Sequence, residues 1–276
     1  MTGGAGGATP AVWRTWTALG LVYVVWGSTY LAIRYVVQSL PPLLTASARF
    51  LVASALVVAF LLVRRRAAVR ASARQLATAA GIGALLLCGG NGGVTLAEQD
   101  GLPSGLTALL IAAVPLCVVV LRALAHDRPT RRTVLGVLLG FAGLAVLLLP
   151  GARPQGVTLV PVLLVLGSGA LWAAGSFVAT RTSLPADPLV TTVAQMLGGA
   201  VSLAVAGLVR GETPRLVDVR VSSVVAFGYL VVFGSIVAFT AYSWLLGHAP
   251  ISWVSTYAYV NLWWLSCSGR CSSGRR

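Results

Sequence analysis

Nine long apolar segments, separated by short polar connections, fill most of this chain. They cover residues 16–37, 43–63, 76–97, 103–122, 133–150, 158–180, 188–209, 221–246 and 251–265. A helix needs about 20 apolar residues to cross the hydrocarbon core of a bilayer. The segments lack the alternation that is typical of barrel strands, and backbone groups in hydrocarbon must be satisfied internally. The pattern therefore predicts an all-α membrane protein. The first segment is too long for a signal peptide and no cleavage site follows it, so we expect it to remain as a helix.

The composition agrees with this pattern. Hydrophobic residues make up 57% of the 276 residues, charged residues make up 9%, and the mean hydropathy is +0.88. A soluble domain of this size cannot bury so much apolar surface. The formal net charge of +14 comes from 20 basic residues, all of them arginine. Because most of these arginines lie in short connections between apolar segments, the positive-inside rule accounts for the charge, and we expect no nucleic-acid partner.

The arginines are distributed unequally between the connections. Clusters at 64–74 and 122–132 follow the second and fourth segments, whereas the connections after the first and third segments contain no arginine. Since positively charged loops stay in the cytoplasm, the N-terminus is predicted to be cytoplasmic. The connection at 210–220 departs from the pattern, because it places three arginines on the predicted outer side.

The two halves of the chain share a weak internal repeat. At an offset of 146 to 147 positions the repeat aligns Trp26 with Trp172, Tyr30 with Phe177, Ala32 with Ala179, Arg34 with Arg181 and Pro41 with Pro188. A unit of five spans is odd, so the second unit enters the membrane from the opposite side. Inverted repeats build many secondary transporters, with the substrate site near the midplane between them. We predict a first repeat at 16–150 and a second at 158–265.

Short motifs follow one another in order along nearly the whole chain. They lie at residues 25–30, 40–42, 48–50, 91–99, 103–106, 114–116 and 254–261. As an ordered set they resemble the EamA-domain proteins of the drug/metabolite transporter superfamily. The resemblance implies ten helices in two inverted five-helix repeats, a location in the cell inner (cytoplasmic) membrane, and movement of small molecules, often export. It implies no particular substrate.

The C-terminal tail departs from the family pattern. The family continues after Asn261 with a proline, an apolar helix and a tenth helix, whereas residues 266–276 are Ser, Cys, Gly and Arg. We therefore expect a shortened ninth helix, no tenth helix, and an aberrant polar tail. One hypothesis is a frameshift after Asn261, because one restored base in GC-rich codons yields a proline and an apolar helix, and the repeat maps Pro115 to position 262. The alternative is a chain that is truly shorter.

Polar and aromatic residues inside the predicted spans are the candidates for a substrate site, because polar groups in hydrocarbon are costly and mark function. They come from helices that the repeat relates, so we expect them to converge on one central cavity. The predicted substrate-binding residues are Trp26, Ser28, Tyr30, Arg49, Asn91, Glu98, Trp172, Ser176, Tyr257 and Tyr259.

Several of these residues have alternative interpretations. Arg49 binds a ligand or forms an ion pair, or its side chain extends to the outer interface. Glu98 pairs with Arg49, binds a cationic group, carries a coupling proton, or is a plain loop acid. Asn91 lies among four glycines that allow close helix approach, and Pro115 removes a helical hydrogen bond in mid-span. Tyr242 is a polar group of the second half or an aromatic residue at the membrane interface.

These observations favour a transporter. His126 and His248 are the only histidines and both lie in connections, and no catalytic or nucleotide-binding motif appears, so we expect no enzyme activity, cofactor or metal site. The predicted function is a secondary transporter that exports small organic metabolites or drugs. Its partners are the solute, the lipid bilayer and, as further candidates, a proton and a second copy of the chain. The alternatives are a non-transporting membrane subunit or scaffold, and an inactive product of a frameshifted transporter gene.

Overall fold

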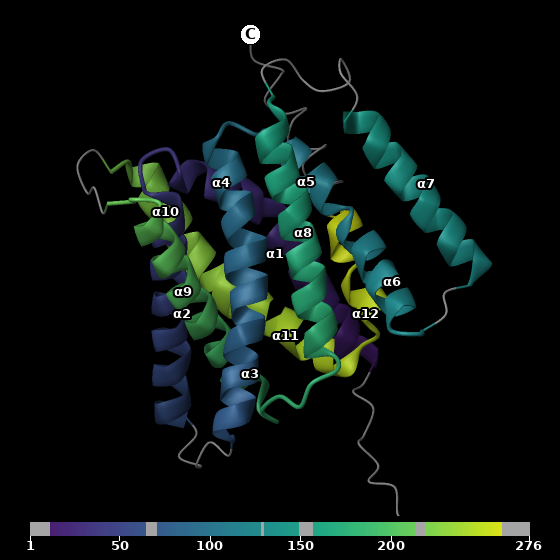
Figure 1. Ribbon diagram of the computed structural model, residues 1–276. Helices are drawn as coiled ribbons and strands as arrows, with labels where there is room; N and C mark the ends of the chain where they lie inside the picture. Colours follow the sequence, from purple (N-terminus) through teal and green to yellow (C-terminus); the bar gives the residue numbers. More distant parts are fainter. Residues whose placement is uncertain (1–11, 65–70, 128–129, 149–156, 214–218, 261–276) are drawn as a thin grey trace, which may run out of the picture.

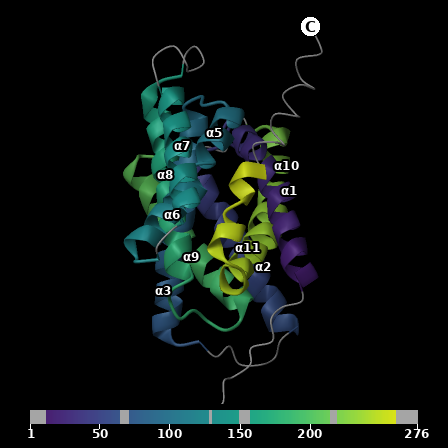
Figure 2. The same cartoon turned by 90° about the vertical axis from the view of Figure 1, so that its right-hand side faces the viewer.

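A computed structural model describes residues 12–64, 71–127, 130–148, 157–213 and 219–260, and this part of the chain forms helices without strands. The elements are α1 (Val12–Val36), α2 (Pro42–Arg64), α3 (Ala73–Gly83), η1 (Ala84–Gly92), α4 (Gly93–Gln99), α5 (Ser104–Ile111), α6 (Val114–Leu124), α7 (Arg131–Leu148), α8 (Leu159–Ala179), α9 (Pro188–Val209), α10 (Val221–Tyr229), η2 (Leu230–Ala238), α11 (Phe239–His248) and α12 (Ile251–Val254). They form one helical bundle, with α7 at its edge (Figures 1 and 2).

Seven helical runs in the described part are long and apolar enough to cross a membrane. They are Val12–Val36, Pro42–Arg64, Ala73–Gln99, Ser104–Leu124, Leu159–Ala179, Pro188–Val209 and Val221–His248. Each of them coincides with one of the predicted spans, and α7 overlaps the predicted span at 133–150. The prediction of an all-α membrane protein is confirmed. The large apolar side chains that remain exposed on these helices, such as Leu62 and Val209, suit a lipid environment.

Two of the runs contain a π-helical segment at their centre. Both η1 and η2 are nine residues long, and η2 begins 146 positions after η1. The run α3–η1–α4 rises from the bottom to the top of Figure 1, whereas α10–η2–α11 descends. In an inverted repeat, matching segments are separated by the offset of the repeat and run in opposite directions. The two π-helical segments do both, which agrees with the predicted repeat. The π-helical geometry itself, which is frequent at functional sites, was not predicted.

One helical run of each half packs against the helices of the other half. The run α3–η1–α4 packs on α8 and α9, and the run α10–η2–α11 packs on α1 and α2. Glycines allow the first contact: a Cβ atom on Gly83 would lie 1.9 Å from the Gln195 carbonyl oxygen, and one on Gly198 would lie 2.1 Å from the Ala80 carbonyl oxygen. Interfaces between helices in lipid are enriched in small residues, because these residues let the backbones approach closely and pack.

The fourth span is interrupted next to a proline. Helix α5 ends at Ile111, and α6 starts at Val114 with Pro115 in its first turn. Because proline lacks an N–H group, it cannot bond to the carbonyl of Ile111 and continue the helix. The expected loss of a hydrogen bond in mid-span is confirmed.

The predicted ninth segment, 251–265, is described as far as residue 260, and this part is helical with one interruption. Helix α12 ends at Val254, a turn follows at residues 255–256, and residues 257–260 are helical again. Ser255 Oγ donates to the Ser252 carbonyl at 3.2 Å and Thr256 Oγ1 to the Trp253 carbonyl at 2.6 Å. Hydroxyl groups that bond to nearby carbonyls compete with the helix. The predicted tail at 266–276 lies outside the described residues.

Two connections are fixed by acidic side chains. The Glu212 carboxylate accepts hydrogen bonds from the backbone N–H groups of Leu43 at 3.0 Å and Leu44 at 2.9 Å, so the connection after α9 caps the N-terminus of α2. At the end of α6, Arg122 Nε donates to Asp127 Oδ2 at 2.6 Å and holds the pKa of that carboxyl below its usual value.

We expect Gly83→Ala to destabilise the protein, because the new Cβ meets the backbone of α9. Overpacking of this kind costs about 1–3 kcal/mol. Gly81→Ala is the matched control on the same helix, since a Cβ there has no neighbour within 4 Å and alanine favours a helix by up to about 1 kcal/mol. The measurement is the thermal unfolding temperature of the purified protein. Equal temperatures for the two variants would contradict the close approach of α3 and α9.

Candidate functional site

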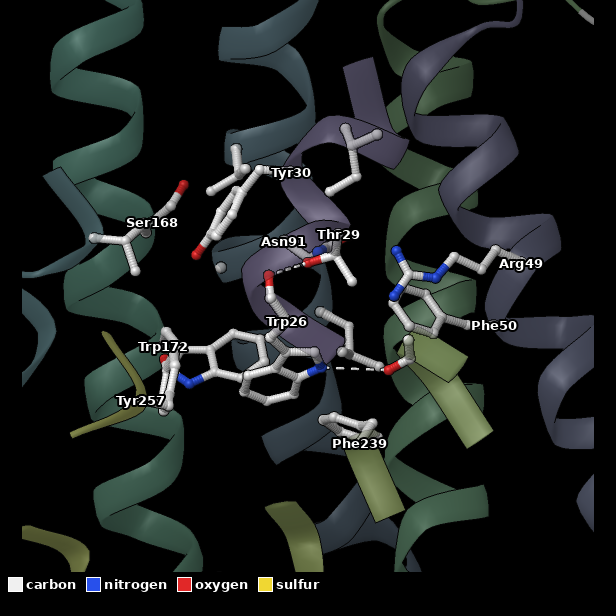
Figure 3. Close-up of a pocket in the computed structure, with 16 residues that line it drawn as sticks. Trp26, Thr29, Tyr30, Arg49, Phe50, Asn91, Ser168, Trp172, Phe239 and Tyr257 are labelled. Carbon is white, nitrogen blue, oxygen red and sulfur yellow. Dashed lines mark hydrogen bonds between the residues drawn. The ribbon is translucent and has the colours of Figure 1, made fainter. Parts of the chain in front are cut away.

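A cavity of about 60 Å³ lies in the middle of the bundle. Both halves of the chain contribute to it, from helices α1, α2, α4, α5, α8 and α11, from both π-helical segments, and from the segment after α12. The lining residues are Trp26, Thr29, Tyr30, Ile33, Arg49, Phe50, Leu87, Gly90, Asn91, Val94, Ile111, Ser168, Trp172, Gly234, Phe239 and Tyr257. Figure 3 shows the large aromatic rings along its lower side and most of the polar groups above them.

Six of the ten predicted site residues line this cavity. They are Trp26, Tyr30, Arg49, Asn91, Trp172 and Tyr257. They reach it from α1, α2, η1, α8 and the segment after α12, so residues that are distant in sequence meet at one place. Apolar walls with a few placed polar groups are typical of small-molecule sites.

The aromatic floor of the cavity, here called the aromatic layer, consists of Trp26, Trp172, Phe239, Tyr242 and Tyr257. The Trp26 ring centroid lies 5.3 Å from that of Trp172, 4.8 Å from that of Tyr242 and 5.0 Å from that of Tyr257. Edge-to-face and tilted pairs at these distances contribute about 0.5–1.5 kcal/mol each beyond the area they bury. The layer therefore ties α1 of the first half to α8 and α11 of the second.

Tyr242 is the hub of this layer and was missed as a site residue. Its hydroxyl accepts a hydrogen bond from Trp172 Nε1 at 2.9 Å and lies 2.6 Å from Ser176 Oγ, whose own proton goes to the Trp172 carbonyl at 2.7 Å. The Tyr242 hydroxyl must therefore donate to Ser176. Only 2% of Tyr242 is exposed, so its interpretation as an interface aromatic is wrong. The position of this tyrosine in the middle of a predicted span was the sequence feature that could have identified it as a site residue.

Arg49 is buried inside the bundle, with 5% of its surface exposed. Its Nε donates to Ser235 Oγ at 2.7 Å, and its guanidinium lies 4.6 Å from the centre of the Phe50 ring. It neither extends to the interface nor pairs with Glu98. Figure 3 shows the guanidinium directed from α2 toward the cavity.

The π-helical segments supply polar backbone to the cavity walls. In η2, the Gly234 carbonyl accepts a hydrogen bond from Trp26 Nε1 at 3.4 Å, which Figure 3 marks. In η1, the Asn91 carbonyl accepts from Thr95 Oγ1 at 2.9 Å, while the buried Asn91 Oδ1 has no partner among the described residues. Asn91 therefore presents a vacant acceptor beside the cavity.

Four predicted residues lie elsewhere. Ser176 supports Tyr242 from behind the aromatic layer, and Ser28 bonds to the Tyr229 hydroxyl at 2.6 Å on the exposed side of α1. Tyr259 is 48% exposed. Glu98 is 4% exposed, but it does not line the cavity, and its two carboxylate oxygens have no hydrogen-bond partner within the described ranges. Sequence spacing did not distinguish these positions from lining ones because it does not fix how the helices are rotated.

Comparison with known proteins identifies the family. The model of the EamA-like transporter family matches residues 15–149. The chain is also 38% identical over 244 residues to the "Uncharacterized inner membrane transporter YedA" of Escherichia coli (strain K12). The aligned residues are 88% of this chain and 78% of the relative. The chain belongs to the EamA-like transporter family. It is therefore a multi-pass membrane transporter.

Two further similarities agree with this assignment. A "Probable amino-acid metabolite efflux pump" of Salmonella typhimurium is 27% identical over 157 residues, which are 56% of this chain and 50% of that protein. A crystal structure of a protein with 18% sequence identity superposes with a TM-score of 0.68 and covers 96% of this chain and 91% of that one. The superposition shows the shared fold.

This EamA-like transporter also has two larger hollows at the ends of α8 and α11. Their volumes are about 350 and 550 Å³, and both are lined by Thr180, Leu246, Gly247 and His248. Ser176 and Tyr242 lie one helical turn before Thr180 and Leu246, which line both hollows, so the aromatic layer adjoins the hollows along α8 and α11. Among the described residues, no three His, Cys, Asp or Glu side chains are placed to hold a metal ion.

We expect Tyr242→Phe to destabilise the bundle, because it removes the acceptor for Trp172 Nε1 and the donor to Ser176. A buried polar group left without a partner costs about 1–3 kcal/mol. The measurement is the thermal unfolding temperature of the purified transporter. Tyr35→Phe, on the exposed side of α1, is the control. If the two variants unfold at the same temperature, the Tyr242 network does not hold the aromatic layer together.

Proposed function

We propose that this protein is a secondary transporter that exports small organic solutes, metabolites or drugs, across the inner membrane. The observation that supports this most is one cavity at the centre of a membrane-spanning bundle, lined by helices of both halves. Secondary transporters bind their substrate at such a place, near the midplane between repeats. The substrate-binding residues we propose are the six that line it: Trp26, Tyr30, Arg49, Asn91, Trp172 and Tyr257.

We also propose a direction of transport and an orientation of the chain in the membrane. The arginine clusters after α2 and α6 favour a cytoplasmic N-terminus, which places the two larger hollows on the cytoplasmic side. Solute would enter from there and reach the cavity when the aromatic layer opens. The name of the Salmonella typhimurium relative, an efflux pump, supports export. The common offset of the π-helical segments supports alternating movement of two repeats, 16–150 and 158–265.

Glu98 is the residue we propose to carry a coupling proton. It is a carboxyl group inside a helical run, buried beside Ser104 and without a hydrogen-bond partner in the described part. Of the charged groups on the helices that pack against α4, Arg34 of α1 acts on it electrostatically, and Arg49 of α2 is engaged with Ser235. Acidic side chains inside membrane spans mark proton relays in pumps and transporters.

The proposal is tested in inside-out vesicles from cells that express the full chain. A proton gradient should drive accumulation of at least one solute from a panel of organic acids, zwitterions, neutral aromatics and amphipathic cations. Glu98→Gln should abolish accumulation but preserve exchange of labelled for unlabelled solute, because the carboxyl then carries no proton while the cavity is unchanged. Asp100→Asn, an exposed acid two positions further on, should behave as the unmodified chain.

Two outcomes would count against this function. No accumulation or exchange of any panel member, with normal abundance in the membrane, would favour a non-transporting subunit. Full gradient-driven accumulation by the Glu98→Gln variant would show that the proton is carried elsewhere.

A further inference from the structure

We propose that Arg49 is the anion-binding group of the central cavity and that the solute carries a carboxylate on an apolar or aromatic body. This inference rests on the proposed function, since it names the chemical class of solute that the cavity takes. It follows from the free donors of Arg49, the absence of a counter-charge among the described residues, and the chemical nature of the remaining lining.

The guanidinium has donors to spare. Arginine has five N–H donors in a planar fork, and the one on Nε is used by Ser235. The two terminal amino groups make no hydrogen bond to any described residue, and Figure 3 shows them on the side of the cavity. Gly234 makes room for them, because a Cβ atom there would lie 3.1 Å from Arg49 Nη2.

No acidic side chain in the described part balances this charge. Asp127 pairs with Arg122, Glu212 caps α2, and Asp187 caps α9 through the Leu189 N–H at 2.9 Å. Asp100 is exposed, and Glu98 does not line the cavity. A buried charge without a partner is costly. An anionic solute that enters the cavity would provide the missing partner.

A carboxylate suits this site better than a phosphate. The arginine fork binds a carboxylate through two parallel hydrogen bonds, and one cation balances one negative charge. Arg49 is the single charged residue in the described lining, so a doubly charged phosphate would be left with uncompensated charge. The aromatic layer offers an apolar surface below Arg49, and the lining includes Asn91, whose Oδ1 has no hydrogen-bond partner among the described residues.

A purely structural role for Arg49 is the alternative, since Ser235 and the Phe50 ring already hold it. The two roles differ in one respect. Structural packing makes binding insensitive to the charge of the solute, whereas an anion-binding role makes it depend on that charge.

The test compares probes of similar shape on the purified full-length protein. Binding of phenylacetate, the neutral phenylacetamide and the dianionic phenylphosphonate is followed by intrinsic fluorescence, because Trp26 and Trp172 line the cavity. We expect phenylacetate to bind about tenfold more tightly than phenylacetamide, as a charge-assisted pair provides. Arg49→Gln should remove this preference and leave phenylacetamide binding unchanged. Arg49→Lys, which keeps the charge but loses the fork, should retain part of it.

Arg64→Gln is the matched control, because it removes an exposed arginine from the other end of the same helix and should keep the full preference. Phenylacetamide binding and gel filtration show whether a variant is folded. If Arg49→Gln is not folded, the Arg49→Lys variant takes its place, and it supports the proposal if it retains only part of the preference for phenylacetate. The proposal is overturned if unmodified protein does not prefer phenylacetate, if it prefers phenylphosphonate, or if a folded Arg49→Gln protein keeps the preference. Transport restricted to neutral or cationic solutes would also overturn it, yet leave the proposed function intact.

Discussion

The close approach of helix backbones is the constraint on which the cavity depends. In lipid there is no hydrophobic drive to bring helices together, so contact must come from van der Waals packing and hydrogen bonds. Gly83 and Gly198 allow α3 and α9 to touch through their backbones, and Gly93 on α4 leaves room for the Ser168 hydroxyl of α8. These contacts hold η1 against the second half, and the cavity forms where η1 turns its Asn91 side toward α1 and α2.

The opposite wall is held in a different way. Segment η2 packs on α1 and α2, and it is also joined to the first half by side-chain hydrogen bonds, from Arg49 to Ser235 and from Trp26 to the Gly234 carbonyl. Such bonds can be exchanged for bonds to solute or water at small net cost, whereas glycine contacts between backbones cannot be loosened without opening a void. The cavity thus lies between a wall held by backbone contacts at glycines and a wall that side-chain hydrogen bonds help to hold. In our account the hydrogen-bonded wall is the part that moves during transport.

The sequence was sufficient for the features that local chemistry dictates. Runs of apolar residues predicted the spans, and Pro115 predicted the loss of a hydrogen bond in the fourth span. Mid-span polarity identified six lining residues, Arg49 and Asn91 among them. Features that depend on tertiary contacts were not accessible. These features are the rotation of α4 that removes Glu98 from the lining, the hydrogen bonds between α8 and α11 that involve Tyr242, and the π-helical geometry. The turn at residues 255–256 could have been expected from two adjacent hydroxyl residues, but hydroxyl groups are common in membrane helices.

Cysteine accessibility shows whether the aromatic layer closes the cavity on the cytoplasmic side, as we propose. In a background without the native cysteines, Asn91→Cys and Thr180→Cys are exposed to an impermeant maleimide in inside-out vesicles. We expect fast labelling at Thr180→Cys, because Thr180 lines the hollows. We expect Asn91→Cys to be protected, and this protection to be lost when Tyr242→Ala opens the layer. Labelling of Asn91→Cys as fast as Thr180→Cys, with Tyr242 in place, would contradict it.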